Sequence, residues 1–285
     1  MELYVVIQIL KKYMATCDCS AKRSASAEPP IRPIDKGIAS TSLLAIIAVM
    51  KYLDHLPLAR QATQLFKWSG VNLSQSSMCR WMGNIADLLI PLYELMSGKV
   101  LESFVVQVDA TTAKYIDPSI KGKAKQGTVW GYNGDATRPY VLYDFQINGT
   151  RAGPEAFLKD YHGYLQCDAH SVYDQIFAPV DATHRSPTEV GCWVHARRKF
   201  YDAREVNKEA FDVLNKIGDL YKLERKLKKV SAGERHTMRQ LHAVPMLNDI
   251  FAWCLTHREK FLPKVSVDGC DAICAQSREG VAAVL

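Results

Sequence analysis

The sequence predicts an α/β protein in which a sheet of short strands is preceded by a helical segment and followed by more helices. Three patterns in the 285 residues support this fold class. Residues 41–97 carry apolar side chains at helical spacing, residues 103–190 contain short runs of β-branched and aromatic residues, and residues 195–260 are charged with no strand pattern. A hydrophobic share of 48% can supply a core for one large domain or two modest ones.

The first 40 residues contain a cysteine pair and a linker. Cys17 and Cys19 are separated by one residue, which is poor spacing for a zinc site, and no second pair lies nearby. Residues 20–37 are rich in Ser, Ala and Pro, which indicates a linker. The eight cysteines of the chain follow no regular framework, so reduced thiols are expected.

Residues 41–100 predict three helices. Ser42 can cap the first, Pro57 can begin a second that ends at Gly70, and Ser74 can cap the third. The third helix should bury one stripe of apolar side chains, namely Met78, Trp81, Met82, Ile85, Leu88 and Leu89.

Two helices joined by a short turn with glycine are also the outline of a helix-turn-helix. In that interpretation Arg60 and Arg80 face DNA, together with neighbouring polar side chains such as Gln61. The alternative is a helical hairpin that packs on the core formed by the later residues. The sequence alone leaves both interpretations open.

Residues 101–200 are predicted to form the sheet. The strand candidates share a short apolar run, and they are Phe104–Asp109, Thr128–Tyr132, Tyr140–Phe145, Tyr164–Asp168 and Glu189–Trp193. A helix is expected over Arg151–Tyr161. Three strands followed by helix, strand, helix and strand match the order of a ribonuclease H-like core, in which the first and fourth strands lie side by side and parallel.

Two aspartates follow buried runs and are candidate metal ligands. Asp109 ends the first predicted strand and Asp168 ends the fourth, so both should meet at one edge of the sheet. Paired carboxylates can hold a divalent metal ion for phosphoryl transfer. The alternative is two unrelated strand-end aspartates that cap the next turn. Cys192 and His195 could also ligate a metal, although a buried thiol beside a hydrogen-bonded histidine is the commoner arrangement.

Basic residues cluster after the fifth predicted strand. Arg197, Arg198 and Lys199 could contact phosphate groups of a nucleic acid, whereas the cluster from Arg225 to Lys229 is interpreted as a solvated helix face. The net charge of +6 suits a nucleic-acid partner. The longest apolar run, Leu43–Met50, is too short to cross a membrane, and Glu2 stands where a secretion signal would carry positive charge. A cytoplasmic protein without a membrane partner is therefore expected.

Four ordered sequence words resemble those of a known family. They are KYLDHLPLAR at residues 51–60, VDAT at 108–111, GYLQCD at 163–168 and GCWVHARRKF at 191–200. In this order and spacing they are similar to the insertion sequence 66 family of transposases, which are bacterial DDE-type enzymes. The resemblance covers roughly residues 31–264, and four ordered words are far more specific than one.

The resemblance implies a function and its site. Asp109 and Asp168 would be the first two acids of the DDE triad, with Mg²⁺ or Mn²⁺ as the cofactor. The DNA partners would be the element ends and the target, with self-association as a further expectation. Residues 201–264 would be a helical insertion into the core, and residues 1–40 would hold the remnant of a zinc-binding segment.

The sequence also departs from the family pattern. Ala110 stands where the family has a glutamate beside the first acid, and the Asn-Asn-x-x-Glu-Arg word that carries the third acid is missing. The available glutamates outside that context are Glu205, Glu209, Glu224, Glu234, Glu259 and Glu279. Residues 265–285 form a divergent tail. We therefore expect a transposase that is truncated at both ends and inactive by itself.

Two rival functions remain at the sequence level. The chain could be a non-catalytic DNA-binding remnant that binds element ends or interferes with a full-length transposase. It could also be a ribonuclease H-like nuclease that uses only the two aspartates.

Overall fold

The computed structural model describes residues 3–14, 16, 24–35, 37–117, 123–168, 170–178, 186–205 and 208–257. The chain divides into two compact units, Met1–Glu94 and Leu95–Leu285. Cys17, Cys19, Glu259, Glu279 and the tail at 265–285 lie outside the described residues.

The first unit combines a small strand pair with packed helices. β1 (Lys12–Met14) pairs antiparallel with β2 (Ser24–Ser26). α1 (Thr41–Tyr52), α2 (Leu58–Ser69) and the first half of α3 (Gln75–Leu101) share a buried cluster. Its members are Ala39, Leu44, Ile47, Leu58, Leu65, Leu73, Met78, Trp81 and Met82.

The helix ends follow the sequence signals with one correction. α2 begins after Pro57 and ends at Gly70, whose φ of 71° is the left-handed conformation that glycine adopts without strain. Ser74 Oγ accepts a hydrogen bond from Ser77 N at 3.1 Å, as expected of a cap for α3. Ser40, and not Ser42, caps α1, because its backbone is extended and its Oγ accepts from Leu43 N at 3.3 Å.

The predicted stripe on α3 is wrong in its second half. Met78, Trp81 and Met82 are buried, but the side chains of Leu88 and Leu89 are 54% and 50% exposed. The buried cluster of the first unit includes α3 only as far as Ile85, which packs against its edge. Helical spacing identifies an apolar stripe but does not reveal how far the covering elements extend.

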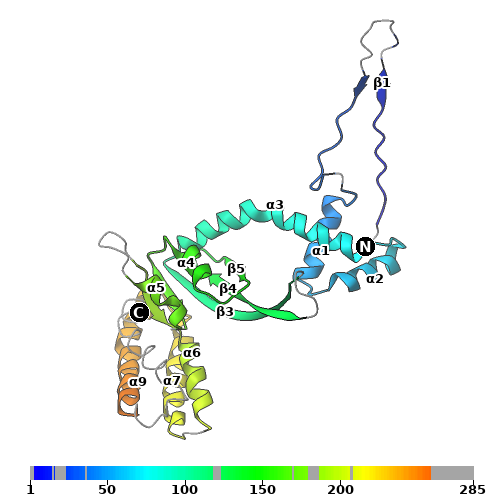
Figure 1. Ribbon diagram of the computed structural model, residues 1–285. Coiled ribbons are helices and arrows are strands. Elements are labelled where there is room, and N and C mark those ends of the chain that lie inside the picture. The colour runs from blue at the N-terminus through cyan, green and yellow to red at the C-terminus, as the bar shows by residue number, and fades with distance from the viewer. Residues whose placement is uncertain are drawn as a thin grey trace. The chain divides into compact units, whose positions relative to one another are not determined.

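The second unit contains a five-stranded mixed sheet (Figure 1). Its strands are β3 (Val105–Ile116), β4 (Ala124–Asn133), β5 (Val141–Gln146), β6 (Tyr164–Cys167) and β7 (Thr188–Gly191). The order across the sheet is β5-β4-β3-β6-β7. β5, β4 and β3 are antiparallel neighbours, whereas β3 with β6 and β6 with β7 are parallel. The α/β class and the parallel pairing of the first and fourth strands are thus confirmed.

Short helices connect the later strands and pack on one face of the sheet. They are α4 (Ala152–Leu158), a 3₁₀ turn (Ser171–Tyr173) and α5 (Asp174–Phe177). The core on this face contains Val106, Val108, Trp130, Tyr132, Leu142, Leu158, Tyr161, Leu165, Cys167 and Tyr173, with Val100 of α3. Helix α4 is shorter than the predicted Arg151–Tyr161. Tyr161 lies beyond its end, and its hydroxyl donates to the carbonyl oxygens of Phe104, directly before β3, and of Tyr164 in β6.

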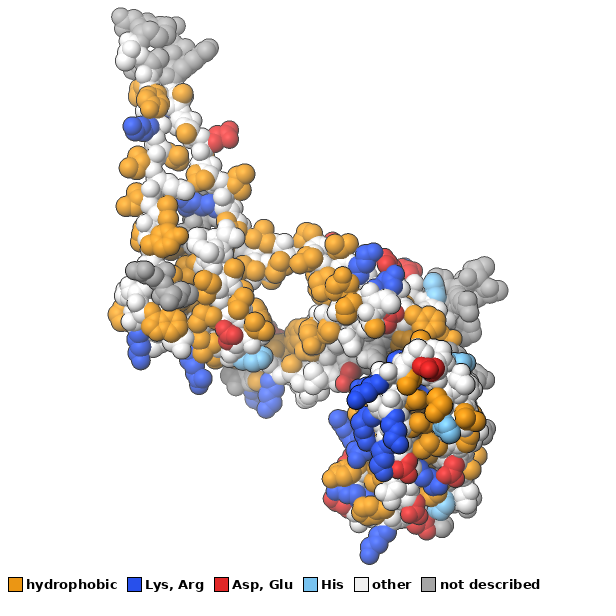
Figure 2. Space-filling model, turned by 180° about the vertical axis from the view of Figure 1, so that it is seen from behind, with side chains coloured by type: hydrophobic (Ala, Val, Ile, Leu, Met, Phe, Trp, Pro, Cys, Tyr) orange, Lys and Arg blue, Asp and Glu red, His pale blue; other side chains and the backbone are white. Residues whose placement is uncertain are grey.

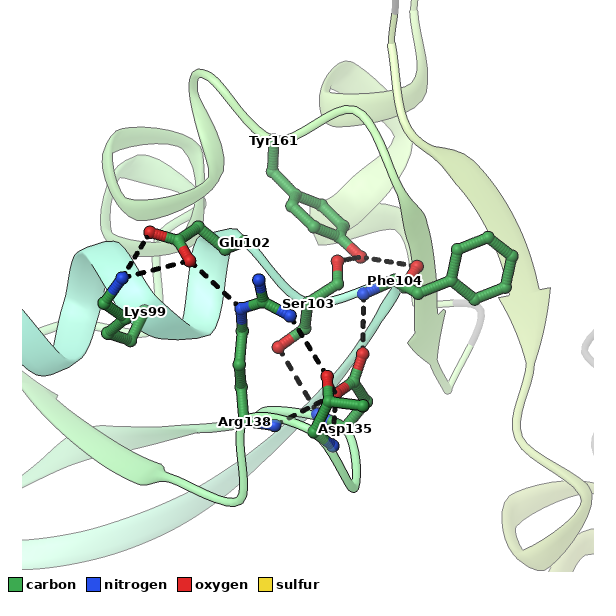
Figure 3. Close-up of polar contacts among 8 residues, drawn as sticks. Lys99, Glu102, Ser103, Phe104, Asp135, Arg138 and Tyr161 are labelled. Atoms are coloured by element: carbon green, nitrogen blue, oxygen red, sulfur yellow. Dashed lines mark hydrogen bonds and ion pairs between the residues drawn. The ribbon is translucent and has the colours of Figure 1, made fainter.

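A polar network fixes the start of β3 (Figure 3). Asp135, in the turn between β4 and β5, accepts hydrogen bonds from the backbone N–H groups of Phe104, Thr137 and Arg138 at 2.7–3.1 Å. The Tyr161 hydroxyl lies 2.9–3.2 Å from the carbonyl oxygens of Ser103, Phe104 and Tyr164. These contacts tie β3, the β4–β5 turn and β6 together, so they set the register on which the site depends.

Helices follow β7, as the sequence predicts. They are α6 (Trp193–Ala203), α7 (Ala210–Leu227), α8 (Ala232–Met238), a π-helical turn (Arg239–Ala243) and α9 (Val244–His257). α7 packs between α6 and α9 (Figure 1) over a second apolar cluster around Ile217 and Ile250. No helix in the described part of the chain is long and apolar enough to cross a bilayer.

Candidate functional site

Asp109 and Asp168 continue the register of two adjacent parallel strands. The last parallel pair of β3 and β6 is Gln107 with Gln166, and each aspartate lies two residues further along. Because side chains alternate between the faces of a strand, Asp109 belongs to the sheet face that carries Gln107. Asp168 directly follows the last residue of β6. The face of Gln107 is opposite to the one that holds the buried core at Val106 and Leu165.

The expected strand end at Asp109 is wrong. β3 runs on to Ile116, and Asp109 pairs with Gly131 of β4 in the antiparallel direction. Only the parallel contact with β6 ends near Asp109, because β6 stops at Cys167. The apolar run marks where β3 is covered, but the strand itself is prolonged by its hairpin partner.

Each aspartate uses one oxygen in a local hydrogen bond. Asp109 Oδ1 accepts from Ala110 N at 2.9 Å, and its side chain is 71% exposed. Asp168 Oδ1 accepts from His170 N at 3.2 Å. Within the described residues the second oxygen of each carboxylate accepts no hydrogen bond. As far as the described residues go, one oxygen of each aspartate could therefore accept a ligand.

His195 joins Asp109 at this place. α6 begins after Cys192, whose backbone is extended, so the first turn of the helix carries His195 toward β3. The imidazole Nε2 lies 3.7 Å from Asp109 Oδ1, and the buried Nδ1 has no hydrogen-bond partner in the described part of the chain. The alternative of a Cys192 and His195 metal pair is not what this geometry favours, because Nε2 faces the aspartate. In the sequence, only the position of His195 directly after the fifth strand pointed to its contact with Asp109.

The pKa of Tyr173 is raised by its buried surroundings and by nearby charges. Its side chain is buried in the sheet core, and its ring meets Trp130 edge to face. Burial raises the pKa of the Tyr173 hydroxyl, and the carboxylates of Asp168 and Asp109 raise it further.

The described glutamates of the helical part are engaged away from the aspartates. Glu224 forms two hydrogen bonds with Arg239 at 2.7 and 2.9 Å, and Glu234 completes a capping box with Ser231. Glu205 pairs with Arg204 at 3.8 Å, and Glu209 lies 3.8 Å from His257. None of these four has a contact with Asp109 or Asp168 among the described residues.

The donor set suits one hard divalent cation. Among the described residues, no three His, Cys, Asp or Glu side chains are grouped to hold a metal ion. Two carboxylates with an available oxygen each still match Mg²⁺ or Mn²⁺, because such ions keep several water ligands and need few from the protein. The candidate ligands are therefore Asp109 and Asp168, with His195 beside the first.

Basic side chains line a groove between α6 and α7. Arg197 and Arg198 project from α6 and are exposed, and Figure 2 shows Lys and Arg side chains gathered on the helical part of the second unit. Lys199 is half-buried and is not part of the groove lining. Arg60 and Arg80, the other predicted DNA contacts, are exposed on α2 and α3 of the first unit.

One predicted polar contact of the first unit is wrong. Gln61 is buried, and its side-chain amide donates to the carbonyl oxygens of Leu56 at 2.9 Å and Ile47 at 3.3 Å. It therefore ties α2 to α1 and does not face DNA. The spacing of polar residues on α2 could not distinguish the two outcomes.

Comparison with known proteins gives one family. The model of the Transposase IS66 family matches residues 36–285. Three similar proteins come from Sinorhizobium fredii: the uncharacterized protein y4jD is 31% identical over 79% of this chain and 46% of its own length. The uncharacterized protein y4qI is 32% identical, over 83% of this chain and 45% of its own length. The uncharacterized protein y4hP is 28% identical, over 90% of this chain and 49% of its own length. The chain spans about half the length of the curated relatives it matches, and it belongs to the IS66 family of transposases.

Proposed function

We propose that this chain carries the metal-binding and DNA-binding part of a DDE-type transposase, built on a ribonuclease H-like core. The observation that supports the proposal is the parallel pairing of β3 with β6 up to Gln107 and Gln166. Asp109 and Asp168 each lie two residues further along the chain from this pair. The strand order β5-β4-β3-β6-β7 supports the ribonuclease H-like assignment. Membership of the transposase family supports DNA as the partner.

Asp109 and Asp168 would hold one divalent cation through their available oxygens. When bound, Mg²⁺ or Mn²⁺ supplies positive charge that activates a nucleophile and stabilises the leaving oxygen in an in-line phosphoryl transfer. His195 would orient the Asp109 carboxylate through its Nε2. Ala110 N holds Oδ1 of the same carboxylate, so its orientation is restricted from two sides.

Arg197 and Arg198 would hold the DNA backbone near this site. Their planar guanidinium groups present several donors and match phosphate geometry. They lie two and three residues after His195 on α6, so one helix would carry both the residue beside Asp109 and the proposed phosphate contacts. Arg60 and Arg80 would contribute DNA contacts from the first unit.

Manganese binding to the full chain tests the metal site. Isothermal titration or electron paramagnetic resonance should show binding that falls at least about tenfold in Asp109→Asn and Asp168→Asn, because each removes a candidate ligand. Asp160→Asn, at an exposed position outside the site, is the matched control and should bind as the unchanged chain does. Equal affinity in all four proteins would refute the assignment.

A second candidate function is a non-catalytic DNA-binding piece of such a transposase. It is favoured by the four described glutamates, which are engaged in caps and ion pairs of the helical part. In this case DNA binding persists without metal, and no strand cleavage accompanies it.

A further inference from the structure

The groove between α6 and α7 combines two kinds of side chain. Five basic residues line it, namely Arg197, Arg198, Arg204, Lys222 and Arg225. They outnumber the two acidic lining residues, Asp202 and Asp219. Among the described residues Arg197, Arg198 and Arg225 form no ion pair. The groove therefore presents positive charge that its own carboxylates do not neutralise, as a surface for a polyanion requires.

Exposed rings alternate with these charges. The side chains of Tyr201 and Phe211 are 45% and 51% exposed, and both line the groove. The Arg204 guanidinium lies 3.3 Å from the centre of the Tyr201 ring, and that of Arg197 lies 5.9 Å from it. Contacts with the phosphates of a duplex need no aromatic ring, because paired bases are stacked on each other. Interleaved rings and arginines are the pattern that binds unpaired bases together with their backbone.

The helix spacing produces one continuous strip. Val194, Arg197, Arg198 and Tyr201 recur at three- and four-residue intervals on α6, so they share one face. Gly218 of α7 lines the groove opposite them, and a Cβ added there would meet no heavy atom within 4 Å. Because Gly218 has no side chain, the groove stays open at this position. Glycine within a helix lowers helix stability by about 1 kcal/mol relative to alanine.

We propose that the α6–α7 groove binds an unpaired stretch of DNA, with the phosphates on the arginines and a base stacked on Tyr201. This inference rests on the proposed function. It adds that the DNA bound at α6 is single-stranded. An unpaired segment arises wherever the end of a duplex is frayed, and the groove would hold one strand of such an end.

Fluorescence anisotropy with the full chain tests the inference. A labelled 15-nucleotide oligothymidine and a 15-base-pair duplex are titrated at several salt concentrations. The single strand should bind more tightly than the duplex. Tyr201→Ala should weaken single-strand binding about 5- to 100-fold, the effect of losing one stacked base, whereas Tyr201→Phe keeps the ring and the affinity.

Three further variants distinguish an effect of the groove from effects of net charge and of unfolding. Arg225→Glu should weaken binding and flatten the salt dependence, because one phosphate contact is lost, whereas the matched reversal Lys229→Glu, outside the groove, should change little. Gly218→Leu should reduce single-strand binding by filling the groove while it raises helix stability, so a loss of binding cannot come from unfolding.

The outcomes distinguish this inference from the proposed function. Equal binding of both oligonucleotides, with no effect of Tyr201→Ala, would overturn the unpaired-strand inference and leave the DNA-binding function intact. Absence of binding to either oligonucleotide at low salt would overturn both. Gly218→Leu could instead change the sedimentation coefficient without changing DNA affinity. That result would indicate that the groove is a contact between copies of the chain, and it would also overturn the inference.

Discussion

Glu189, on strand β7, has a strongly raised pKa. It lies beside Leu165 of the core, and Cys167 Sγ donates to its Oε1 at 3.7 Å. Burial raises the pKa of this carboxyl to about 7, and the nearby charge of Asp174 adds to the rise, while the Cys167 contact opposes it. A carboxyl in a half-buried position stays protonated far above its usual range because water is partly excluded from the charged form.

This pKa predicts a loss of stability toward neutral pH. Between pH 4.5 and about 7 the folded protein keeps a proton that the unfolded chain has released. The free energy of unfolding therefore falls as pH rises through this window. Glu189→Gln should flatten the dependence and raise the melting temperature more at pH 8 than at pH 5, as measured by thermal denaturation followed by circular dichroism.

Glu234→Gln is the control for this experiment. The Ser231 hydroxyl and backbone N–H donate to Glu234 and hold its pKa below the usual range, so its contribution is present above that range and is lost only in acid. Its substitution should lower stability at both pH values. A melting temperature of the unchanged chain that stays constant from pH 5 to pH 8 would contradict the role of Glu189.

Asp135 is the residue on which the start of β3 depends most. The Thr137 hydroxyl, the Phe104 N–H and further backbone N–H groups donate to it and hold its pKa at about 2. Asp135→Ala should lower the free energy of unfolding by about 1–3 kcal/mol, because several donors lose their acceptor. Chemical denaturation checks this. Glu102→Gln removes only surface contacts with Lys99 and Arg138 and should cost clearly less than Asp135→Ala. An equal cost would argue against the turn as the anchor.

At the scale of the element, α6 carries two different sets of functional candidates. Its first turn brings His195 to Asp109, and its exposed face carries Arg197 and Arg198 into the groove with α7. A helix fixes these side chains relative to one another, because its rise and rotation per residue are constant. The proposed metal site and the proposed DNA contacts therefore share one short helix.

Charge reversal on α6 should weaken DNA binding selectively. Arg197→Glu with Arg198→Glu should lower duplex affinity strongly at low salt and reduce the slope of affinity against salt, because two phosphate contacts are lost. Lys228→Glu with Lys229→Glu, the same change of charge beyond the end of α7, should have a smaller effect. A gel-shift titration over a range of salt measures both. Equal losses in the two double variants would indicate a contribution of net charge alone.

Helix α3 contributes to the core of the first unit only through its first half. Met78→Ala should destabilise that unit by about 2–5 kcal/mol, since the buried side chain leaves a cavity. Leu88→Ala should remain within about 0.5 kcal/mol, because the side chain is already half exposed. Denaturation followed by tryptophan fluorescence compares the two. A large cost at Leu88 would mean that this part of α3 is covered after all.

At the scale of the whole molecule, the chain has two candidate metal ligands, Asp109 and Asp168, and none of the described glutamates of the helical part contacts them. We expect the purified chain to bind Mn²⁺ and DNA without completing strand cleavage and transfer. Removing one member of a cooperative catalytic set causes large losses, since the remaining groups no longer act together. A cleavage assay on DNA that carries the cognate element ends, with Mg²⁺ or Mn²⁺, is the measurement. Turnover that Asp109→Ala abolishes would show that another acid completes the site.

Local patterns in the sequence determined much of this protein. Apolar runs located the five strands, Gly70 and Ser74 marked helix ends, and four ordered words gave the transposase family. The expected neighbourhood of the first and fourth strands is also confirmed. These features depend on backbone preferences and on residue spacing within one element, which the sequence carries directly. The catalytic roles of Asp109 and Asp168 stay predictions.

Contacts between distant residues were decided only by tertiary structure. The β4 partner prolongs β3 past Asp109, the first turn of α6 brings His195 to that aspartate, and the packing of α7 against α6 forms the groove. Burial of Gln61 and the raised pKa of Glu189 have the same origin, since both depend on which elements cover a side chain. Spacing along a chain defines the face of an element, but the partner of that face is set by how all elements pack together.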